Sequence, residues 1–123
     1  MPKLFIDHIV VSVKDLKKSV KFYSAFLGKA RISKFDAHWQ IGDTKLFLTS
    51  AYKKSPRAFD KHNLGLNHLA FGLKKLSDLK EMAQKLDRVK IKHSGIIKNK
   101  YSGKEYVWFD DPDKIRLEFY LRN

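Results

Sequence analysis

The chain has 123 residues, and 43% of them are hydrophobic, which is enough to bury one core. It contains no cysteine, which excludes disulfides, Cys-ligated zinc, iron–sulfur clusters and thiol nucleophiles. The 26 Lys and Arg against 13 Asp and Glu give a formal net charge of +13, which favours either an anionic partner or simple solubility.

The distribution of charge and apolar residues indicates which partners to expect. Lysines are spread along the chain, without a helix-turn-helix, zinc-finger or aromatic-basic RNA-binding motif, so we expect a small-molecule substrate and no nucleic acid. No apolar run approaches the roughly 20 residues of a membrane span, and no secretory signal is apparent. The sequence therefore predicts no membrane contact and, by default, a cytoplasmic location.

The first half of the chain reads as a strand, a helix and three further strands. Residues 6–13 are β-branched and apolar and predict a buried strand. Asp15 is expected to cap the following helix and Gly28 to end it. One apolar stripe recurs along this helix at helical spacing: Leu16, Val20, Tyr23 and Leu27. Three shorter strands are expected afterwards, over residues 30–35, 38–41 and 45–49, the last two joined by a turn at 42–43.

The second half repeats this order. Residues 66–76 match residues 6–16, with a His, a Lys and a Leu recurring identically. Ser77 is expected to cap a second helix. Its apolar stripe is Leu79, Met82, Ala83 and Leu86. Further strands are expected over residues 89–92, 105–109 and 115–121, with a turn at 110–113.

A repeat of this length is typical of a duplicated supersecondary unit. The prediction is an α+β fold in which two βαβββ modules, about residues 4–50 and 65–121, form a curved mixed sheet with a central cleft. The polar stretch 51–65 joins the modules. We expect one domain over residues 1–123.

Three residues predict a metal site. His8 and His68 occupy the same place in the two repeats, and the alternation of the last strand puts Glu118 on its polar face. Two imidazoles and one carboxylate form a facial triad for a divalent metal, with positions left open for water or substrate. The alternative is that both histidines are hydrogen-bonded core residues and that the glutamate faces solvent. In that case the symmetry of the two histidines survives from the duplication although the metal has been lost.

The chain resembles the vicinal oxygen chelate superfamily, which includes glyoxalase I, bleomycin and fosfomycin resistance proteins and extradiol dioxygenases. The resemblance covers nearly the whole chain. It is carried by the first strand and helix start, the "S-x-x-F-Y-x-x-x-L-G" helix, the Asn-His-Leu-Ala-Phe strand and the Asp-Pro-Asp turn with the last strand: residues 7–16, 19–28, 67–71 and 111–118. It implies that His8, His68 and Glu118 bind one divalent metal, Mn, Fe, Ni or Zn.

The resemblance also separates the members of this superfamily. Glyoxalase I has a further ligand at the position of Phe47, which cannot bind a metal, so we expect Phe47 to line the substrate cleft instead. Lys98 and Ser102 match the spacing with which fosfomycin enzymes hold a phosphonate, although a flexible basic loop would look the same. Val10 and Trp108 replace an expected threonine and tyrosine, which argues against fosfomycin resistance itself. Trp108 is expected to contact substrate.

These observations predict a metal-dependent lyase, transferase or dioxygenase that acts on a small, anionic, oxygen-chelating substrate. The alternative is a metal-free protein that sequesters a drug or other ligand, of the bleomycin resistance type. The resemblance also implies a homodimer, for which exposed aromatic side chains could form the interface: Trp39, Tyr52 and Phe59.

Overall fold

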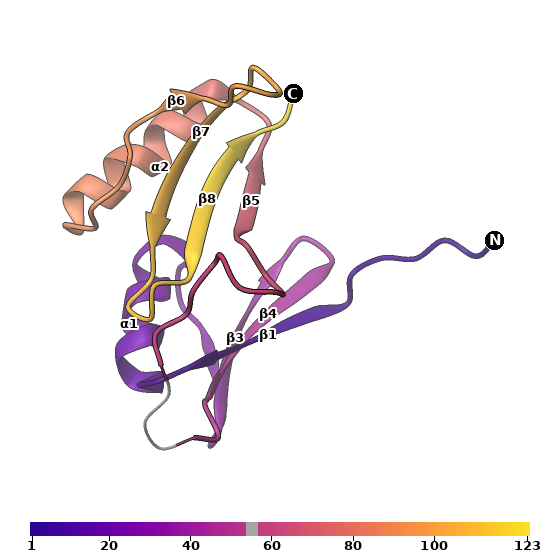
Figure 1. The fold of residues 1–123 in the computed structure, drawn as a ribbon, viewed down its shortest axis with the longest axis vertical. Helices are drawn as coiled ribbons and strands as arrows, with labels where there is room; N and C mark the ends of the chain where they lie inside the picture. Colours follow the sequence, from indigo (N-terminus) through magenta and orange to yellow (C-terminus); the bar gives the residue numbers. More distant parts are fainter. Residues whose placement is uncertain (54–56) are drawn as a thin grey trace. The chain divides into compact units, whose positions relative to one another are not determined.

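The computed structural model describes residues 1–53 and 57–123, so Lys54, Ser55 and Pro56 of the predicted linker lie outside the described residues. The chain divides into two compact units, Met1–Arg57 and Ala58–Asn123. Each unit contains one helix and a four-stranded mixed sheet (Figure 1). The α+β class and the two βαβββ modules are thereby confirmed.

The first unit is built on a sheet with strand order β1-β4-β3-β2. Its first strand pairs in parallel with its last, and the other pairs are antiparallel. The helix packs on one face of this sheet, where the rings of Tyr23 and Trp39 lie 5.9 Å apart. Its elements are β1 (His8–Val13), α1 (Leu16–Leu27), β2 (Arg31–Ile32), β3 (Asp36–Ile41) and β4 (Thr44–Ser50).

The second unit repeats this topology with the strand order β5-β8-β7-β6. Its first and last strands are again parallel. Its elements are β5 (Leu69–Leu73), α2 (Leu76–Arg88), β6 (Ile97–Lys98), β7 (Glu105–Asp110) and β8 (Arg116–Leu121). The buried Asp111 carboxylate accepts hydrogen bonds from the backbone N–H groups of Asp113 and Ile115, which stabilises the predicted turn between β7 and β8.

The strand registers support the repeat alignment made from the sequence. In the first sheet Phe47 lies beside Val10, and in the second Glu118 lies beside Ala70. Since Val10 and Ala70 are both two residues after the repeated histidine, Phe47 and Glu118 occupy equivalent places in the two modules.

The helix ends agree with the sequence in the first unit and differ in the second. The Asp15 side chain accepts a hydrogen bond from the Lys18 N–H, and Gly28 ends α1 at φ 86°. These two predictions are confirmed. The prediction for Ser77 was wrong, because α2 begins at Leu76 and its N-cap residue, Lys75, makes no side-chain capping bond.

Two further predictions need correction. The buried line of α1 is Ser19, Tyr23 and Phe26, while Leu16, Val20 and Leu27 are only partly covered. The strand predicted over residues 89–92 does not form, because Lys90 adopts a left-handed φ of 60° just after the helix. The short strand β6 lies further on, at Ile97–Lys98.

Exposure differs from the sequence prediction at β1 and β3. Only one face of β1 is covered, and His8, Val10 and Ser12 on the other face are exposed. Trp39 is buried rather than exposed, with its indole N–H donating to the Gly28 carbonyl at 2.9 Å. Tyr52 is fully exposed. Neither described helix has the length and apolarity needed to cross a membrane.

Candidate functional site

The last strand of the second unit separates its core from a polar face. In β8, Leu117 and Phe119 are buried against α2 and its neighbours, whereas Arg116, Glu118 and Tyr120 alternate onto the opposite face. The predicted alternation is thereby confirmed. Glu118 therefore presents a carboxylate on the sheet face that the helix leaves uncovered.

His68 lies beside this carboxylate. It directly precedes β5, which pairs with β8, and its Nε2 atom lies 3.6 Å from Glu118 Oε1. This distance is too long for a hydrogen bond. Two ligand atoms that share one metal at bond lengths of about 2.0–2.2 Å lie roughly 3–3.5 Å apart. The pair therefore fits a shared cation with only a small closure.

Asn67 fixes which nitrogen of His68 is available. The Asn67 side-chain NH2 donates to the Lys61 carbonyl at 3.1 Å, so its Oδ1 faces His68 Nδ1 at 2.8 Å. Because an amide oxygen only accepts, the proton lies on Nδ1 of His68. In the neutral imidazole the Nε2 lone pair then points toward Glu118, which is the arrangement of a metal-ligating imidazole oriented by a second residue.

The first unit contains the same arrangement around the other repeated histidine. The Asp7 carboxylate accepts from Nδ1 of His8 at 2.8 Å, which leaves Nε2 as the acceptor nitrogen. At the place of Glu118 stands Phe47, whose ring centroid lies 6.0 Å from that of His8. Phe47 is partly exposed on the face opposite α1.

The environment of Glu118 combines burial with nearby cations. Its side chain is only 12% exposed. Burial raises the pKa of Glu118 above its ordinary value, and positive charge on His68 and on Arg116 acts in the opposite direction. Because burial outweighs both neighbours, a cation bound beside Glu118 would stabilise its charged form.

Trp108 lies across from Glu118 in the β7–β8 register. The guanidinium group of Arg116 stacks on the Trp108 ring at 3.9 Å from its centroid and also donates to the Asp110 carboxylate at 2.6 Å. The indole is therefore held flat on the Glu118 side of the sheet by a cation–π contact.

The segment predicted to hold an anion lies next to this face. Ser102 Oγ is hydrogen-bonded to the hydroxyl of Tyr120, two residues beyond Glu118 on the same face of β8. Asn99 Oδ1 accepts from the backbone N–H groups of Tyr101 and Ser102, which orders the turn. Lys98 is exposed at the end of β6, so its ammonium group is available to a ligand.

A cavity of about 380 Å³ opens on the second unit. Tyr120 and the small residues Ala70 and Gly72 line it, together with Leu73, Lys74 and Arg122. Because Ala70 pairs with Glu118, this cavity lies along the same strands as the His68–Glu118 pair.

The structure thus brings His68, Glu118, Trp108 and Tyr120 to one sheet face, and His8 and Phe47 to the equivalent face of the other unit. Within either unit, the described residues do not gather three or more His, Asp or Glu side chains. Sequence reasoning missed the orienting residues Asp7 and Asn67. Their signal was available, because each directly precedes a repeated histidine and can accept a hydrogen bond.

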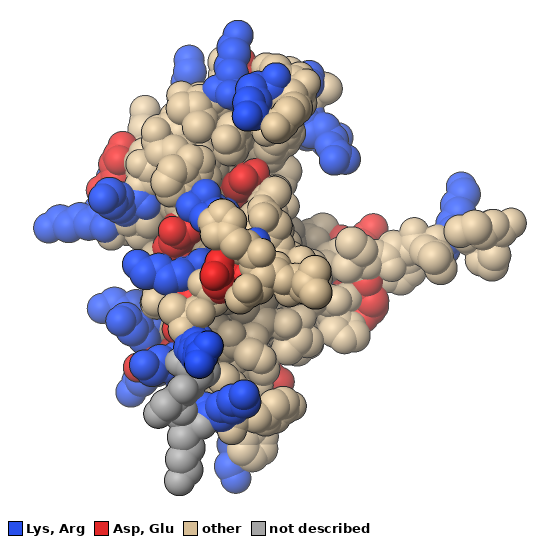
Figure 2. All heavy atoms as spheres, viewed as in Figure 1, with Lys and Arg blue, Asp and Glu red and all other residues tan. Residues whose placement is uncertain are grey.

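The surface charge is widely distributed. Figure 2 shows Lys and Arg side chains scattered over the visible face, with few Asp and Glu among them. The excess of 26 basic over 13 acidic residues therefore does not gather in one patch on this face, and it raises the local concentration of small anions generally.

Comparison with known proteins identifies the family. Residues 5–119 match the model of the Glyoxalase/Bleomycin resistance protein/Dioxygenase superfamily. The chain is 29% identical over 120 residues to metallothiol transferase FosB of Staphylococcus epidermidis, covering 94% of this chain and 80% of that protein.

Solved structures share the fold. The glyoxylase/bleomycin resistance protein/dioxygenase domain from Frankia sp. EAN1pec superimposes with a TM-score of 0.83 at 22% identity, covering 99% of this chain and all of that one. A putative glyoxalase from Bacillus halodurans gives a TM-score of 0.79 at 23% identity, with 95% of each chain covered. With the matched family model, these findings establish that the chain belongs to the Glyoxalase/Bleomycin resistance protein/Dioxygenase superfamily, the vicinal oxygen chelate proteins.

Proposed function

We propose that the protein is a metal-dependent enzyme that acts on a small, anionic substrate with neighbouring oxygen atoms. The metal, one of Mn, Fe, Ni or Zn, would be held by His68 and Glu118, with His8 as the third ligand. The observation that carries the proposal is that Nε2 of His68 faces the Glu118 carboxylate at 3.6 Å while its Nδ1 is bonded to Asn67.

A further observation supports this ligand set. His8 has the same hydrogen-bond pattern as His68, because its Nδ1 is bonded to the residue before it, Asp7. Open positions of the metal would accept two substrate oxygens, and the ion would stabilise negative charge that develops on them.

The surrounding side chains give roles to this chain's own residues. Ser102, held against Tyr120, and the exposed Lys98 would bind an anionic group through a hydrogen bond and a point charge. Trp108 would form an apolar wall beside Glu118. The relative from Staphylococcus epidermidis is named a metallothiol transferase, which makes metal-dependent thiol transfer the first reaction class to assay.

Metal binding tests the proposal directly. Protein stripped with a chelator and then dialysed is titrated with Mn²⁺, Ni²⁺ and Zn²⁺ in a calorimeter. We expect one ion per chain, and a loss of affinity of at least about tenfold in His68→Ala and Glu118→Gln. His62→Ala removes an exposed histidine of the same unit and should leave the affinity unchanged.

The outcomes separate three situations. Loss in all three ligand variants, including His8→Ala, supports the complete triad. Loss only in the His68 and Glu118 variants would remove His8 from the ligand set. An unmodified protein that takes up no ion, or binds as well after substitution of His68 and Glu118, would contradict the metal enzyme and favour a metal-free ligand-binding protein.

We also propose that the protein is a homodimer, supported by exposed apolar side chains in the first unit. Leu4, Phe5 and Ile6, just before β1, are between 63% and 83% exposed, and Val10 is 54% exposed. A group of exposed apolar residues favours a protein–protein contact, whereas single ones need no explanation. Sedimentation at micromolar concentration should give twice the monomer mass, and Phe5→Ser should shift it toward the monomer. A monomer in the unmodified protein would contradict this.

A further inference from the structure

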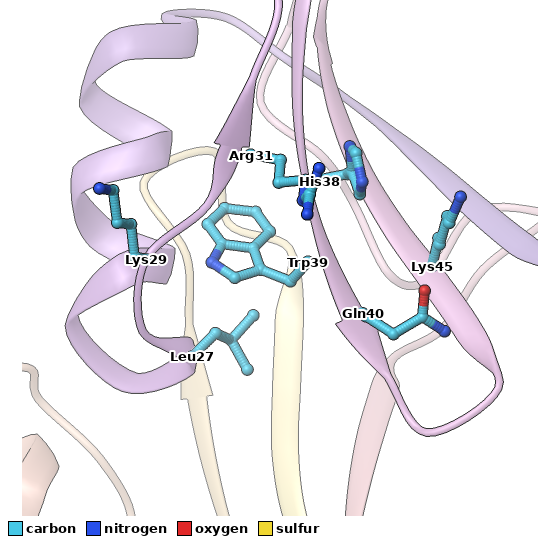
Figure 3. A pocket seen from close by; sticks show the side chains of 7 residues that line it. All are labelled: Leu27, Lys29, Arg31, His38, Trp39, Gln40 and Lys45. Atoms are coloured by element: carbon cyan, nitrogen blue, oxygen red, sulfur yellow. The ribbon is translucent and has the colours of Figure 1, made fainter.

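The first unit carries a cavity of its own. It has a volume of about 580 Å³, within the range of small-molecule sites. It lies around strand β3, where β3 passes the end of α1 (Figure 3). The side chains that line it are Leu27, Lys29, Arg31, His38, Trp39, Gln40 and Lys45.

The lining has a strongly one-sided charge. It includes Lys29, Arg31 and Lys45 but no Asp or Glu. No ion pair is formed by these three cations among the described residues. Cations without acidic neighbours repel one another, so the site is electrostatically more favourable when an anion occupies it.

The polar side chains converge from adjacent strands. Arg31 pairs with His38 across β2 and β3, and Gln40 pairs with Lys45 across β3 and β4. Figure 3 shows the ends of Arg31 and His38 side by side, with Gln40 further along β3 and Lys45 on β4. The His38 ring is held against Phe47, with centroids 4.7 Å apart, so its orientation is set by packing.

The cavity also has an apolar side. Trp39 and Leu27 lie toward α1, and Figure 3 shows the indole between that helix and the sheet. The Trp39 N–H is bonded to the Gly28 carbonyl and the residue is only 4% exposed, so the ring fixes this wall of the cavity but offers an occupant little surface. Because Trp39 alternates with His38 and Gln40 along β3, the polar side chains lie on the other face of the sheet, and these hold an occupant.

We propose that this cavity binds a small organic phosphate or carboxylate, with its anionic group among Arg31, His38 and Lys45. The site differs from the proposed metal centre and from the Lys98–Ser102 segment, and it requires no metal. It adjoins the first unit's repeated histidine, because Lys45 is the register partner of His8.

The test follows the indole signals of metal-stripped, dialysed protein by NMR in about 0.1 M salt, which screens distant surface charges. The chain has two tryptophans, and Trp108→Phe assigns the remaining indole N–H signal to Trp39. Phenyl phosphate is titrated as the probe, with benzyl alcohol as its uncharged counterpart. We expect a saturable shift of the Trp39 signal with phenyl phosphate and weaker binding of benzyl alcohol.

Charge-removing variants then locate the site. Arg31→Gln and Lys45→Gln should each raise the dissociation constant about three- to tenfold. Lys17→Gln removes the same charge from an exposed position on α1 and should change it less than about twofold. All three positions are exposed, and an unchanged amide spectrum verifies the fold.

Three results would overturn the proposal: a Trp39 signal that does not move, equal binding of benzyl alcohol, or a Lys17→Gln effect as large as that of Arg31→Gln. Because no metal is present, none of these results bears on the His68–Glu118 site. Failure of metal binding would likewise leave this cavity site standing.

Discussion

The ring of Phe47 stands nearly perpendicular to the imidazole of His8, with an interplanar angle of 80° and 6.0 Å between centroids. In the other module the equivalent residue is a carboxylate beside the equivalent histidine. The duplication has thus kept both histidines and their orienting neighbours, while one module carries a metal-binding type of side chain and the other an aromatic ring.

Replacing Phe47 with glutamate tests this equivalence. The introduced carboxylate would lie beside an imidazole already oriented by Asp7, so we expect Phe47→Glu to bind a divalent metal more tightly or to take up an additional ion. Phe47→Gln introduces a side chain of the same shape as glutamate but without its charge, and it should not do so. Calorimetric titration with Ni²⁺ compares the two variants, and identical titrations would contradict the equivalence. Phe47→Ala should instead leave a cavity beside His38 and reduce stability.

Asn67→Ala should weaken metal binding without removing a ligand. The Asn67 oxygen holds the proton on Nδ1 of His68, and loss of such an orienting residue typically reduces metal affinity about 10- to 100-fold. Nitrogen-15 NMR of the imidazole should show the Nε2–H tautomer increasing in the variant. Asn63→Ala, in the same exposed segment, serves as the control. Unchanged affinity and tautomer in Asn67→Ala would exclude the orienting role.

Lys98→Ala should weaken the binding of a phosphonate or carboxylate ligand to the metal-loaded protein. A hydrogen bond to a charged group contributes about 1.5–3 kcal/mol, and the exposure of Lys98 favours the lower end of that range. Calorimetry at low salt measures the loss. Lys100→Ala removes a neighbouring cation that stacks on Tyr101 and should have little effect. Equal losses in both variants would indicate general attraction by net charge instead of a site.

The helix caps predict a contrast in stability. Asp15→Ala removes the acceptor of the Lys18 N–H and should lower the free energy of unfolding by about 0.5–2 kcal/mol. Ser77→Ala removes no capping bond and should stay within about 0.5 kcal/mol of the unmodified protein. Urea denaturation of both variants measures the difference. A larger loss for Ser77→Ala would mean that α2 has a different N-terminal cap.

The sequence was most informative where apolar and polar residues alternate strictly along a strand. Residues 116–121 alternate apolar and polar side chains, and a strand can satisfy this pattern in only one register, so the sheet face that carries Glu118 followed directly. The same alternation in Ala37, Trp39 and Ile41 would have predicted a buried Trp39.

The missed features depend on hydrogen bonds that form only in the folded chain. The apolar residues at 89 and 91 suggested a strand, but the Ile91 N–H bonds back to the Leu86 carbonyl and closes a turn after α2. The tautomer of His68 depends on Asn67, which in turn is held by Lys61. The place of Asn67 before a repeated histidine is visible in the sequence, but the side-chain rotamers that complete these hydrogen bonds are not.

The parallel pairing of first and last strands also sets the order in which the chain can be assembled during synthesis. In the second unit β8 lies between β5 and β7, so this sheet lacks an inner strand until Arg116–Leu121 has left the ribosome. The first sheet has its last strand, β4, as soon as Ser50 has emerged. Domains generally fold from the N-terminal side during translation. The first module can therefore form its sheet before β8 is available to pair with β5.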